Sequence, residues 1–236
     1  MQSDSVRIVS LSPAITATLV DAGLEEQVVG CSAFCKLKGE VPVIGDLHTI
    51  DYEKLLRTKP THVFVQQQVV GNDTHLQHLH DTNAFTLRTW KLNTIKEIES
   101  TSSEIVKMFN LPVNPFRFQP LNHRVDEEPT LLISNGSEHQ LGVCFGKGTY
   151  LDDVWTAMGG VNALQTQGWR VLSIEDIARL APVRIILVSD IQITNNTPLS
   201  SLNIPVTPFV HEDVLLPSTR ISDVAQALYE RWKEAK

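Results

Sequence analysis

The 236-residue sequence lacks the features that would place it in several large classes of protein. It has no run near the roughly 18 consecutive apolar residues of a membrane-spanning helix. The stretch from Met1 to Ser5 lacks the basic and apolar regions of a secretory signal. Positive charge is not in excess, because the formal net charge is −7 and no basic stripe could follow a phosphate backbone. We therefore expect no membrane insertion and no nucleic-acid partner.

Cysteine is scarce, with three residues at positions 31, 35 and 144. An odd number cannot pair completely, and no second pair is present to complete a zinc site. We expect ordinary reduced thiols, which are typical of a reducing compartment. The chain is then cytoplasmic as given. If a leader was removed from it, the protein is periplasmic or otherwise extracytoplasmic.

The common catalytic motifs are missing as well. There is no GxSxG, no HExxH, no P-loop and no GxGxxG after the first predicted strand. The segment Gly146–Thr149 lacks the spacing of a phosphate loop and follows no clear strand. The histidines at 75, 78 and 80 have no nearby carboxylate or cysteine that would complete a metal site. We predict no catalytic residue, cofactor or metal site, and hence a binding protein and not an enzyme.

The sequence does contain a regular alternation of short apolar strands and helices. The first strand ends at Ser12–Pro13, where serine can cap and proline can open a helix. Prolines at 112, 115, 120 and 129 exclude a helix of any length between 110 and 129. The sequence thus predicts an N-terminal α/β lobe over 1–109, a proline-rich connector over 110–129 and a C-terminal α/β lobe over 130–236. The predicted strands are 6–12, 27–31, 62–65, 85–89, 130–134, 184–188 and 204–210, and the predicted helices are 14–22, 51–58, 73–82, 94–109, 150–158, 174–180 and 221–236.

One internal match relates the two predicted lobes. Residues 51–60 align without gaps on residues 173–182, with a glutamate, an arginine and a proline at the same offsets. A predicted strand begins two residues after each proline, which indicates two copies of one supersecondary unit. Strands separated by helices form parallel sheets through right-handed crossovers. Ligands of such sheets bind beyond the carboxyl ends of the strands.

The chain contains, in this order, the segments Arg7–Thr16 and Val29–Ser32, the predicted helix of Glu53, and the segments Gly146–Tyr150, Met158–Gly160 and Gly168–Glu175. Together they resemble the class III periplasmic solute-binding proteins of ABC transporters, which bind cobalamin or ferric siderophores. The resemblance implies two Rossmann-like lobes with short parallel sheets flanked by helices, and a ligand cleft between the lobes. It also implies that one long helix joins the lobes, whereas this chain has its proline-rich segment there.

The resemblance further implies that the ligand is bound by residues that follow the strands. Aromatic faces and a few polar groups would suit a large, flat metal chelate, such as cobalamin, heme or a ferric siderophore. Cobalamin binders have aromatic residues at the positions that match Leu47 and Gln66, so the ligand could be a chelate other than cobalamin. The implied ligand residues are Ser12, Pro13, Phe34, Leu47, His48, Gln66, Asn135, Gly136, Phe145, Trp169, His211 and Glu212.

Several of these residues also have an ordinary structural explanation. Trp169 could be a half-buried packing residue, and Gln66 could be the polar end of a strand. The two histidines, His48 and His211, could be surface residues, or they could donate a hydrogen bond or coordinate a metal.

Two glutamates are predicted to contact the transporter. By the resemblance, Glu53 and Glu175 would dock to arginines of an ABC permease. The alternative is a helical i, i+4 pair in each lobe, with Arg57 and Arg179. The leading interpretation is a solute-binding protein for a corrinoid or another metal chelate. A cytoplasmic member of the same fold that handles or modifies a metal tetrapyrrole, and a ligand-controlled regulatory module, remain as alternatives.

Overall fold

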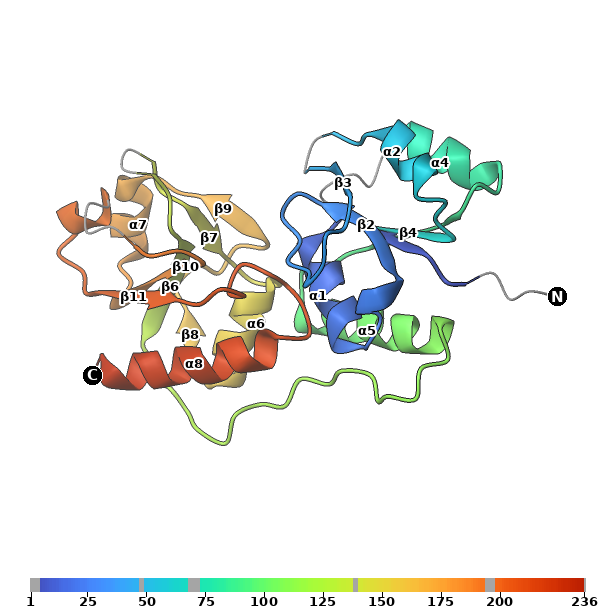
Figure 1. The fold of residues 1–236 in the computed structure, drawn as a ribbon. Helices are drawn as coiled ribbons and strands as arrows, with labels where there is room; N and C mark the ends of the chain where they lie inside the picture. Colours follow the sequence, from blue (N-terminus) through green and yellow to red (C-terminus); the bar gives the residue numbers. More distant parts are fainter. Residues whose placement is uncertain (1–4, 47–48, 68–72, 138–139, 194–197, 236) are drawn as a thin grey trace. The chain divides into compact units, whose positions relative to one another are not determined.

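The computed structural model describes residues 5–46, 49–67, 73–137, 140–193 and 198–235. The chain divides into two compact units, each with its own sheet (Figure 1). Unit 1 comprises Met1–Leu92 with Glu97–Phe116, and unit 2 comprises Asn93–Lys96 with Arg117–Lys236. The boundaries expected from the prolines, at 109 and 130, stay a prediction.

Unit 1 contains a five-stranded sheet in the order β3-β2-β1-β4-β5, in which every neighbouring pair is parallel. The central strand β1 has Ile8 opposite both Val28 and His62. This confirms the parallel α/β architecture that the alternating pattern predicted. The strands are β1 (Ile8–Ser10), β2 (Val28–Ser32), β3 (Val43–Gly45), β4 (His62–Gln66) and β5 (Thr86–Trp90), and the helices are α1 (Pro13–Asp21), the 3₁₀ turn η1 (Glu25–Gln27), α2 (Tyr52–Arg57), α4 (Thr74–Asp81) and α5 (Ile95–Met108).

Both faces of this sheet are covered by helices. Leu55 of α2 and Leu76 of α4 pack against Val9 and its neighbours on one face. The opposite face carries Phe64, whose ring contacts Trp90 at 5.0 Å between centroids. Figure 1 shows α2 and α4 on one side of the sheet and α1 and α5 on the other. Burial on both faces explains why these strands are short, nearly continuous apolar runs.

Unit 2 has a mixed sheet in the order β11-β10-β6-β7-β9, with β8 paired to β6. Its β6, β8, β10 and β11 are parallel, but β7 runs antiparallel to both β6 and β9. The sequence analysis did not predict β7, β8 or β9. The strands are β6 (Pro129–Ser134), β7 (Val143–Phe145), β8 (Val161–Asn162), β9 (Trp169–Val171), β10 (Arg184–Ser189) and β11 (Val206–Val210), and the helices are α6 (Tyr150–Ala157), α7 (Ile174–Leu180), the 3₁₀ turn η2 (Pro198–Ser201) and α8 (Ile221–Glu234).

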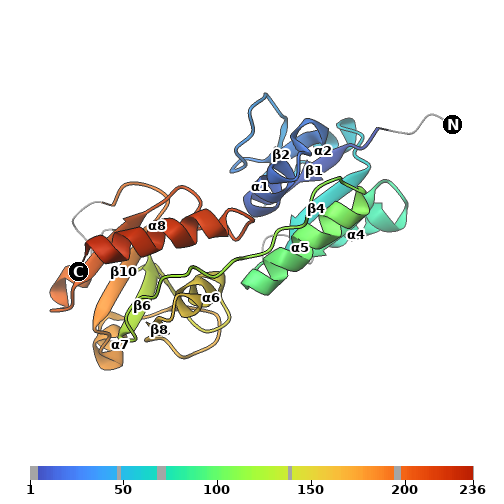
Figure 2. The same cartoon turned by 90° about the horizontal axis from the view of Figure 1, so that it is seen from below.

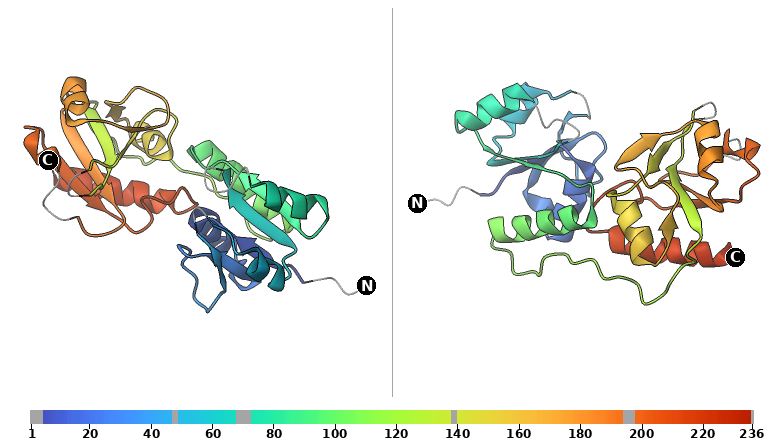
Figure 3. Two further views of the ribbon diagram at one scale, coloured as in Figure 1. Left: turned by 90° about the horizontal axis from the view of Figure 1, so that it is seen from above. Right: turned by 180° about the vertical axis from the view of Figure 1, so that it is seen from behind.

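Helices flank this second sheet as well. Ile177 of α7 and Leu199 of η2 pack with Leu131 and the residues of β10 on one face. Figures 2 and 3 show α7 and α8 on opposite sides of the strands. The long helix α8 buries Val224, Leu228 and Trp232 along one stripe, as an amphipathic surface helix should.

The proline-rich segment contains neither helix nor strand between residues 109 and 128, as predicted. Each end of it is bonded to its own unit. The Phe116 N–H donates to Ser102 Oγ at 2.9 Å, and the Val125 N–H donates to Met158 O, also at 2.9 Å. A hydrogen bond therefore holds the segment near each of its ends.

The internal repeat is visible in the backbone. Both α2 and α7 are followed by a residue with φ of +47°, Lys59 and Ala181, and each is succeeded by the proline of the repeat. Neither residue is glycine, so each conformation costs on the order of 1 kcal/mol. Arg7 compensates at the first copy by donating from Nε to the carbonyl oxygens of Thr58 and Lys59 at 2.9 and 3.1 Å.

Gly160 packs closely against a buried side chain in the core of unit 2. A Cβ at this position would lie 2.3 Å from Nε1 of Trp155, which is fully buried. We expect Gly160→Ala to destabilise the protein by about 1–3 kcal/mol, because the indole cannot move without displacing the surrounding core. Urea unfolding measures the change.

Gly39→Ala is the matched control, since nothing lies within 4 Å of its added Cβ. Equal stability of the two variants would show that the packing around Trp155 is looser than described.

Candidate functional site

The carboxyl end of β1 forms the first part of the candidate site. Ser12 caps α1, where its Oγ accepts a hydrogen bond from the Ile15 N–H at 3.4 Å. The same hydroxyl donates to Oε1 of Gln66, the last residue of β4, at 2.9 Å. Pro13 occupies the first turn of α1, as the sequence predicted. The structure therefore brings Ser12, Pro13 and Gln66 together at one edge of the sheet.

Phe34 lies in the turn that follows β2 at the same edge. Its side chain is 56% exposed, which is unusual for phenylalanine. The turn is closed by a hydrogen bond from the Cys35 N–H to Ser32 O at 3.1 Å. Phe34 is thus presented to solvent from a short, hydrogen-bonded turn. Leu47 and His48, the other predicted ligand residues of the first lobe, lie outside the described residues.

A group of polar side chains behind this turn was not recognised from the sequence. The Cys35 sulfur lies 3.1 Å from Thr16 Oγ1 and 3.2 Å from Ser32 Oγ. Thr16 Oγ1 also donates to Ser10 Oγ at 2.9 Å. The spacing of Cys31 and Cys35, four residues apart at the end of a strand, could have drawn attention to this group. The hydroxyl groups could not be foreseen, because Ser10, Thr16 and Ser32 belong to three different elements.

In unit 2 the predicted aromatic residues Phe145 and Trp169 are cross-strand neighbours in the antiparallel pair β7–β9. Directly opposed residues of such a pair point to the same face of the sheet. Trp169 is half-buried, whereas Phe145 is 3% exposed and its ring contacts Tyr150 at 5.8 Å in an edge-to-face arrangement. Within unit 2, then, packing occupies Phe145 and leaves part of Trp169 available.

Asn162 holds this aromatic pair in place. Its Nδ2 donates to Phe145 O at 2.7 Å and to Asp152 Oδ1 at 2.8 Å, while its Oδ1 accepts from the Leu164 N–H at 2.9 Å. All three bonds are buried, so they fix the end of β7 against α6. The sequence analysis missed this residue because its partners are distant in the chain.

The segment Gly146–Thr149 needs a correction, because it does follow a strand, β7. It nevertheless serves as a helix start: Thr149 caps α6 and donates from Oγ1 to Gly146 O at 2.8 Å. The Gly148 N–H donates to the Asp152 carboxylate at 3.2 Å. A phosphate would have to displace that carboxylate, and so phosphate binding is disfavoured here.

Asn135 and Gly136 follow β6 at its carboxyl end. The Asn135 N–H donates to Val188 O at 2.7 Å, which extends the pairing with β10. At Gly136 an added Cβ would lie 1.9 Å from Gln140 O, so the tight loop there requires glycine. Gly136 therefore has a structural role whether or not a ligand approaches it.

His211 and Glu212 follow β11. Nδ1 of His211 accepts from the Asp213 N–H at 3.1 Å, so the neutral ring carries its proton on Nε2. In that form the imidazole can donate a hydrogen bond but cannot coordinate a metal through Nε2. Glu212 is exposed. Of the two roles considered for His211, the structure favours the hydrogen-bond donor.

The two glutamates that were predicted to contact a permease, Glu53 and Glu175, both lie in the first turn of a helix and are exposed. Glu53 forms the expected i, i+4 pair with Arg57. The corresponding pair in the second unit was predicted wrongly, because Arg179 bonds Asp176 at 3.0 Å instead of Glu175. Asp176 is held in place by a capping box with Ser173, which brings its carboxylate within reach of the arginine.

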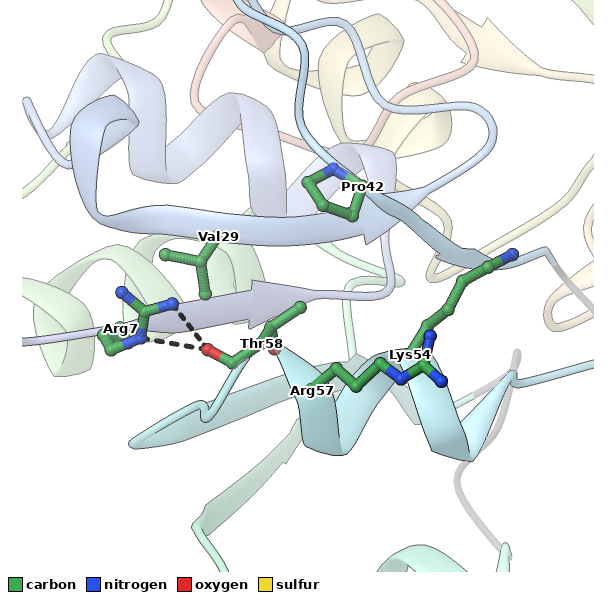
Figure 4. A pocket seen from close by; sticks show the side chains of 6 residues that line it. All are labelled: Arg7, Val29, Pro42, Lys54, Arg57 and Thr58. Atoms are coloured by element: carbon green, nitrogen blue, oxygen red, sulfur yellow. Dashed lines mark hydrogen bonds between the residues drawn. The ribbon is translucent and has the colours of Figure 1, made fainter.

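Two adjoining pockets lie at the opposite, amino-terminal edge of the sheet of unit 1. The smaller one, of about 360 Å³, lies between the start of β1 and α2 (Figure 4). Arg7 borders both pockets, but its guanidinium is used to cap α2 through Thr58 O. None of the predicted ligand residues borders either pocket. Because ligands of parallel sheets bind at the carboxyl ends of the strands, we place the candidate site at that edge.

Within the part of the chain that is described, no group of three or more His, Cys, Asp or Glu side chains could hold a metal ion. His75, from the histidine tract, instead packs on Tyr52 with ring centroids 4.2 Å apart. Likewise, no helix of the described residues has the length and hydropathy that crossing a membrane requires.

The comparisons with known proteins agree with this geometry. The model of a family described as periplasmic binding protein matches residues 8–108. The resemblance to class III periplasmic binding proteins is confirmed. The chain has their α/β fold, with a parallel sheet flanked by helices. A search of curated proteins finds no match in sequence.

Three solved periplasmic binding proteins illustrate the similarity. The heme-binding protein RhuT from Roseiflexus sp. RS-1 has a TM-score of 0.72 at 17% identity, with 98% of this chain and 99% of that chain covered. The vitamin B12 binding protein BtuF of Vibrio cholerae has a TM-score of 0.72 at 18% identity, with 97% of each chain covered. An ABC transporter substrate-binding protein from Listeria monocytogenes EGD-e has a TM-score of 0.66 at 14% identity, with 97% of each covered.

Ser12 provides a test of the geometry at the first strand end. We expect Ser12→Ala to destabilise the protein by about 1 kcal/mol, because α1 loses its cap, whereas Ser12→Gly should cost only a few tenths. Thermal or urea unfolding of both variants measures the difference. If Ser12→Ala leaves the stability unchanged, the hydroxyl does not act as a cap.

Proposed function

We propose that this protein binds a metal chelate, such as a corrinoid, heme or a ferric siderophore, and presents it to an ABC permease without chemical change. The observation that carries the proposal is the similarity, over nearly the whole chain, to binding proteins for heme and vitamin B12. On this proposal the protein acts outside the cytoplasm. The alternative is a cytoplasmic protein of the same fold that modifies a metal tetrapyrrole.

The residues at the carboxyl ends of the strands support this function. A flat macrocycle needs apolar faces to stack on, and Phe34 and Trp169 provide exposed or half-exposed rings. Its amide or carboxylate substituents need hydrogen-bond partners, which Gln66, Asn135 and the Nε2–H of His211 could provide. We propose the predicted set as ligand-binding residues, with Phe145 acting through its packing beneath Trp169.

Visible absorption titration with hemin, cobalamin, cobinamide and a ferric siderophore tests the function. We expect one of these to bind with micromolar affinity or better, and its spectrum to return unchanged on release. Absence of binding by all four contradicts the proposal, and conversion of the ligand would favour the tetrapyrrole-modifying alternative.

Phe34 and Trp169 should dominate the affinity if they stack on the ligand. Replacing either by alanine should weaken binding about thirtyfold, which corresponds to about 2 kcal/mol for an aromatic anchor. Leu56→Ala is a matched control, because Leu56 is an exposed apolar residue on α2. Equal losses of ligand affinity in Leu56→Ala and Phe34→Ala would show that Phe34 does not contact the ligand.

Glu53 and Glu175 are proposed as the permease contacts. Each lies exposed at the second residue of its helix, so each unit has a carboxylate at the same helical position. We expect the double variant Glu53→Gln, Glu175→Gln to bind permease vesicles at least tenfold more weakly, with ligand affinity unchanged.

The control is Glu26→Gln with Glu127→Gln, which removes the same charge from two other exposed positions. If the two double variants weaken permease binding equally, net charge and not docking explains the effect.

A further inference from the structure

Cys31 and Cys35 lie close together at the carboxyl edge of the sheet of unit 1. Cys31 lies near the end of β2, and Cys35 lies in the turn after it, which the bond from its N–H to Ser32 O closes. Cys31 and Cys35 are close enough for each thiol to shift the pKa of the other. Neither cysteine is in a disulfide.

The surroundings of Cys35 suit a thiolate. The hydroxyl groups of Ser32 and Thr16 lie within hydrogen-bond distance of its sulfur, at 3.2 and 3.1 Å, and in the thiol form the sulfur donates to Ser10 O at 3.8 Å. The bond from Cys31, followed by those from Ser32 and Thr16, outweighs burial and lowers the pKa of Cys35 to about 6. Thiolate, and not thiol, is the nucleophilic form of cysteine.

Rotation of a neighbouring hydroxyl group can give this thiolate another hydrogen-bond donor. The Ser10 hydroxyl donates its own hydrogen to Ser12 O at 3.2 Å, so it keeps this hydrogen bond when Thr16 turns away. Thr16 can then turn its single hydrogen from Ser10 Oγ to the Cys35 sulfur. The thiolate gains this donor by rotation about one bond, without movement of the backbone.

The three cysteines differ in a way that assigns their roles. Cys35 is partly exposed, whereas Cys31 is 5% exposed and the adjacent Cys35 raises the pKa of its thiol. Cys144 is fully buried in unit 2, and burial raises its pKa to about 12. An accessible thiolate beside a buried thiol is the arrangement of an attacking cysteine and a resolving cysteine.

We propose that Cys31 and Cys35 form a redox-active pair that a peroxide converts to a disulfide. The Cys35 thiolate attacks one peroxide oxygen, the O–O bond breaks, and a sulfenic acid and hydroxide or alkoxide result. The Cys31 sulfur then displaces the sulfenic hydroxyl, which leaves as water with the Cys31 proton. Overall, two thiols are oxidised to one disulfide and one peroxide is reduced.

The disulfide would enclose Phe34 in a small covalent loop. The turn would then be joined to the end of β2 by a bond as well as by backbone hydrogen bonds. If Phe34 contacts the ligand, which rests on the proposed function, oxidation changes the affinity for that ligand by fixing or displacing the ring. The oxidation itself does not depend on what the protein binds.

Peroxide treatment of the native protein tests the pair. After unfolding, the thiol count should fall from three to one, and a proteolytic digest should contain peptides of Cys31 and Cys35 linked to each other. Cys31→Ser should instead accumulate a sulfenic acid at Cys35 that a dimedone probe labels, and Cys35→Ser should show neither product.

Cys144→Ser is the matched control and should form the disulfide at the rate of the unaltered protein. Three remaining thiols after peroxide, or oxidation of Cys144 as fast as that of Cys35, would overturn the proposal.

A second measurement separates this inference from the proposed function. Hemin and cobalamin affinities are compared for the reduced and the oxidised protein, and we expect at least a threefold difference for the one that binds. Equal affinities of the reduced and the oxidised protein would show that the disulfide does not change ligand binding through Phe34. Disulfide formation in a protein that binds neither ligand supports the redox pair and counts against the ligand proposal alone.

Discussion

The parallel pairing of β1 between β2 and β4 is the constraint on which the first unit depends. Parallel strands that are joined through helices all end at the same edge of their sheet. Ser12, Phe34 and Gln66 therefore meet at that edge, although the chain separates them by more than a helix. The same pairing places the Cys31–Cys35 turn beside the first turn of α1. A candidate ligand surface and a candidate redox pair thus arise from one ladder of backbone hydrogen bonds.

Those parts of the fold that have a strong local signal were predictable from the sequence. The helices α2 and α7 were expected from their glutamate, arginine and proline, and they end within a residue of the expected positions. The strands β7, β8 and β9 were missed because each has three residues or fewer, which is too short for an alternating pattern. The partner of Arg179 was missed for a different reason, since the capping box that positions Asp176 depends on backbone geometry.

The candidate site was predictable as a set of positions but not as a set of contacts. Strand ends can be read from a sequence, so Ser12 and Gln66 were both expected at the carboxyl ends of their strands, where a hydrogen bond joins them. Which side chains face solvent there depends on distant parts of the chain. Phe145 is buried by Tyr150, and Asn162 reaches it from β8. The thiolate environment of Cys35 likewise combines Ser10, Thr16 and Ser32 from β1, α1 and β2.

The matching left-handed residues, Lys59 and Ala181, extend the internal repeat from sequence to backbone. Each has a φ of +47° and lies between a helix and the strand after it. Both helices have a glutamate as their second residue. On the docking proposal, a receptor meets an exposed carboxylate in the first turn of a helix in each unit. Recognition of this kind requires only one type of complementary surface, which a symmetric receptor made of two identical subunits possesses twice.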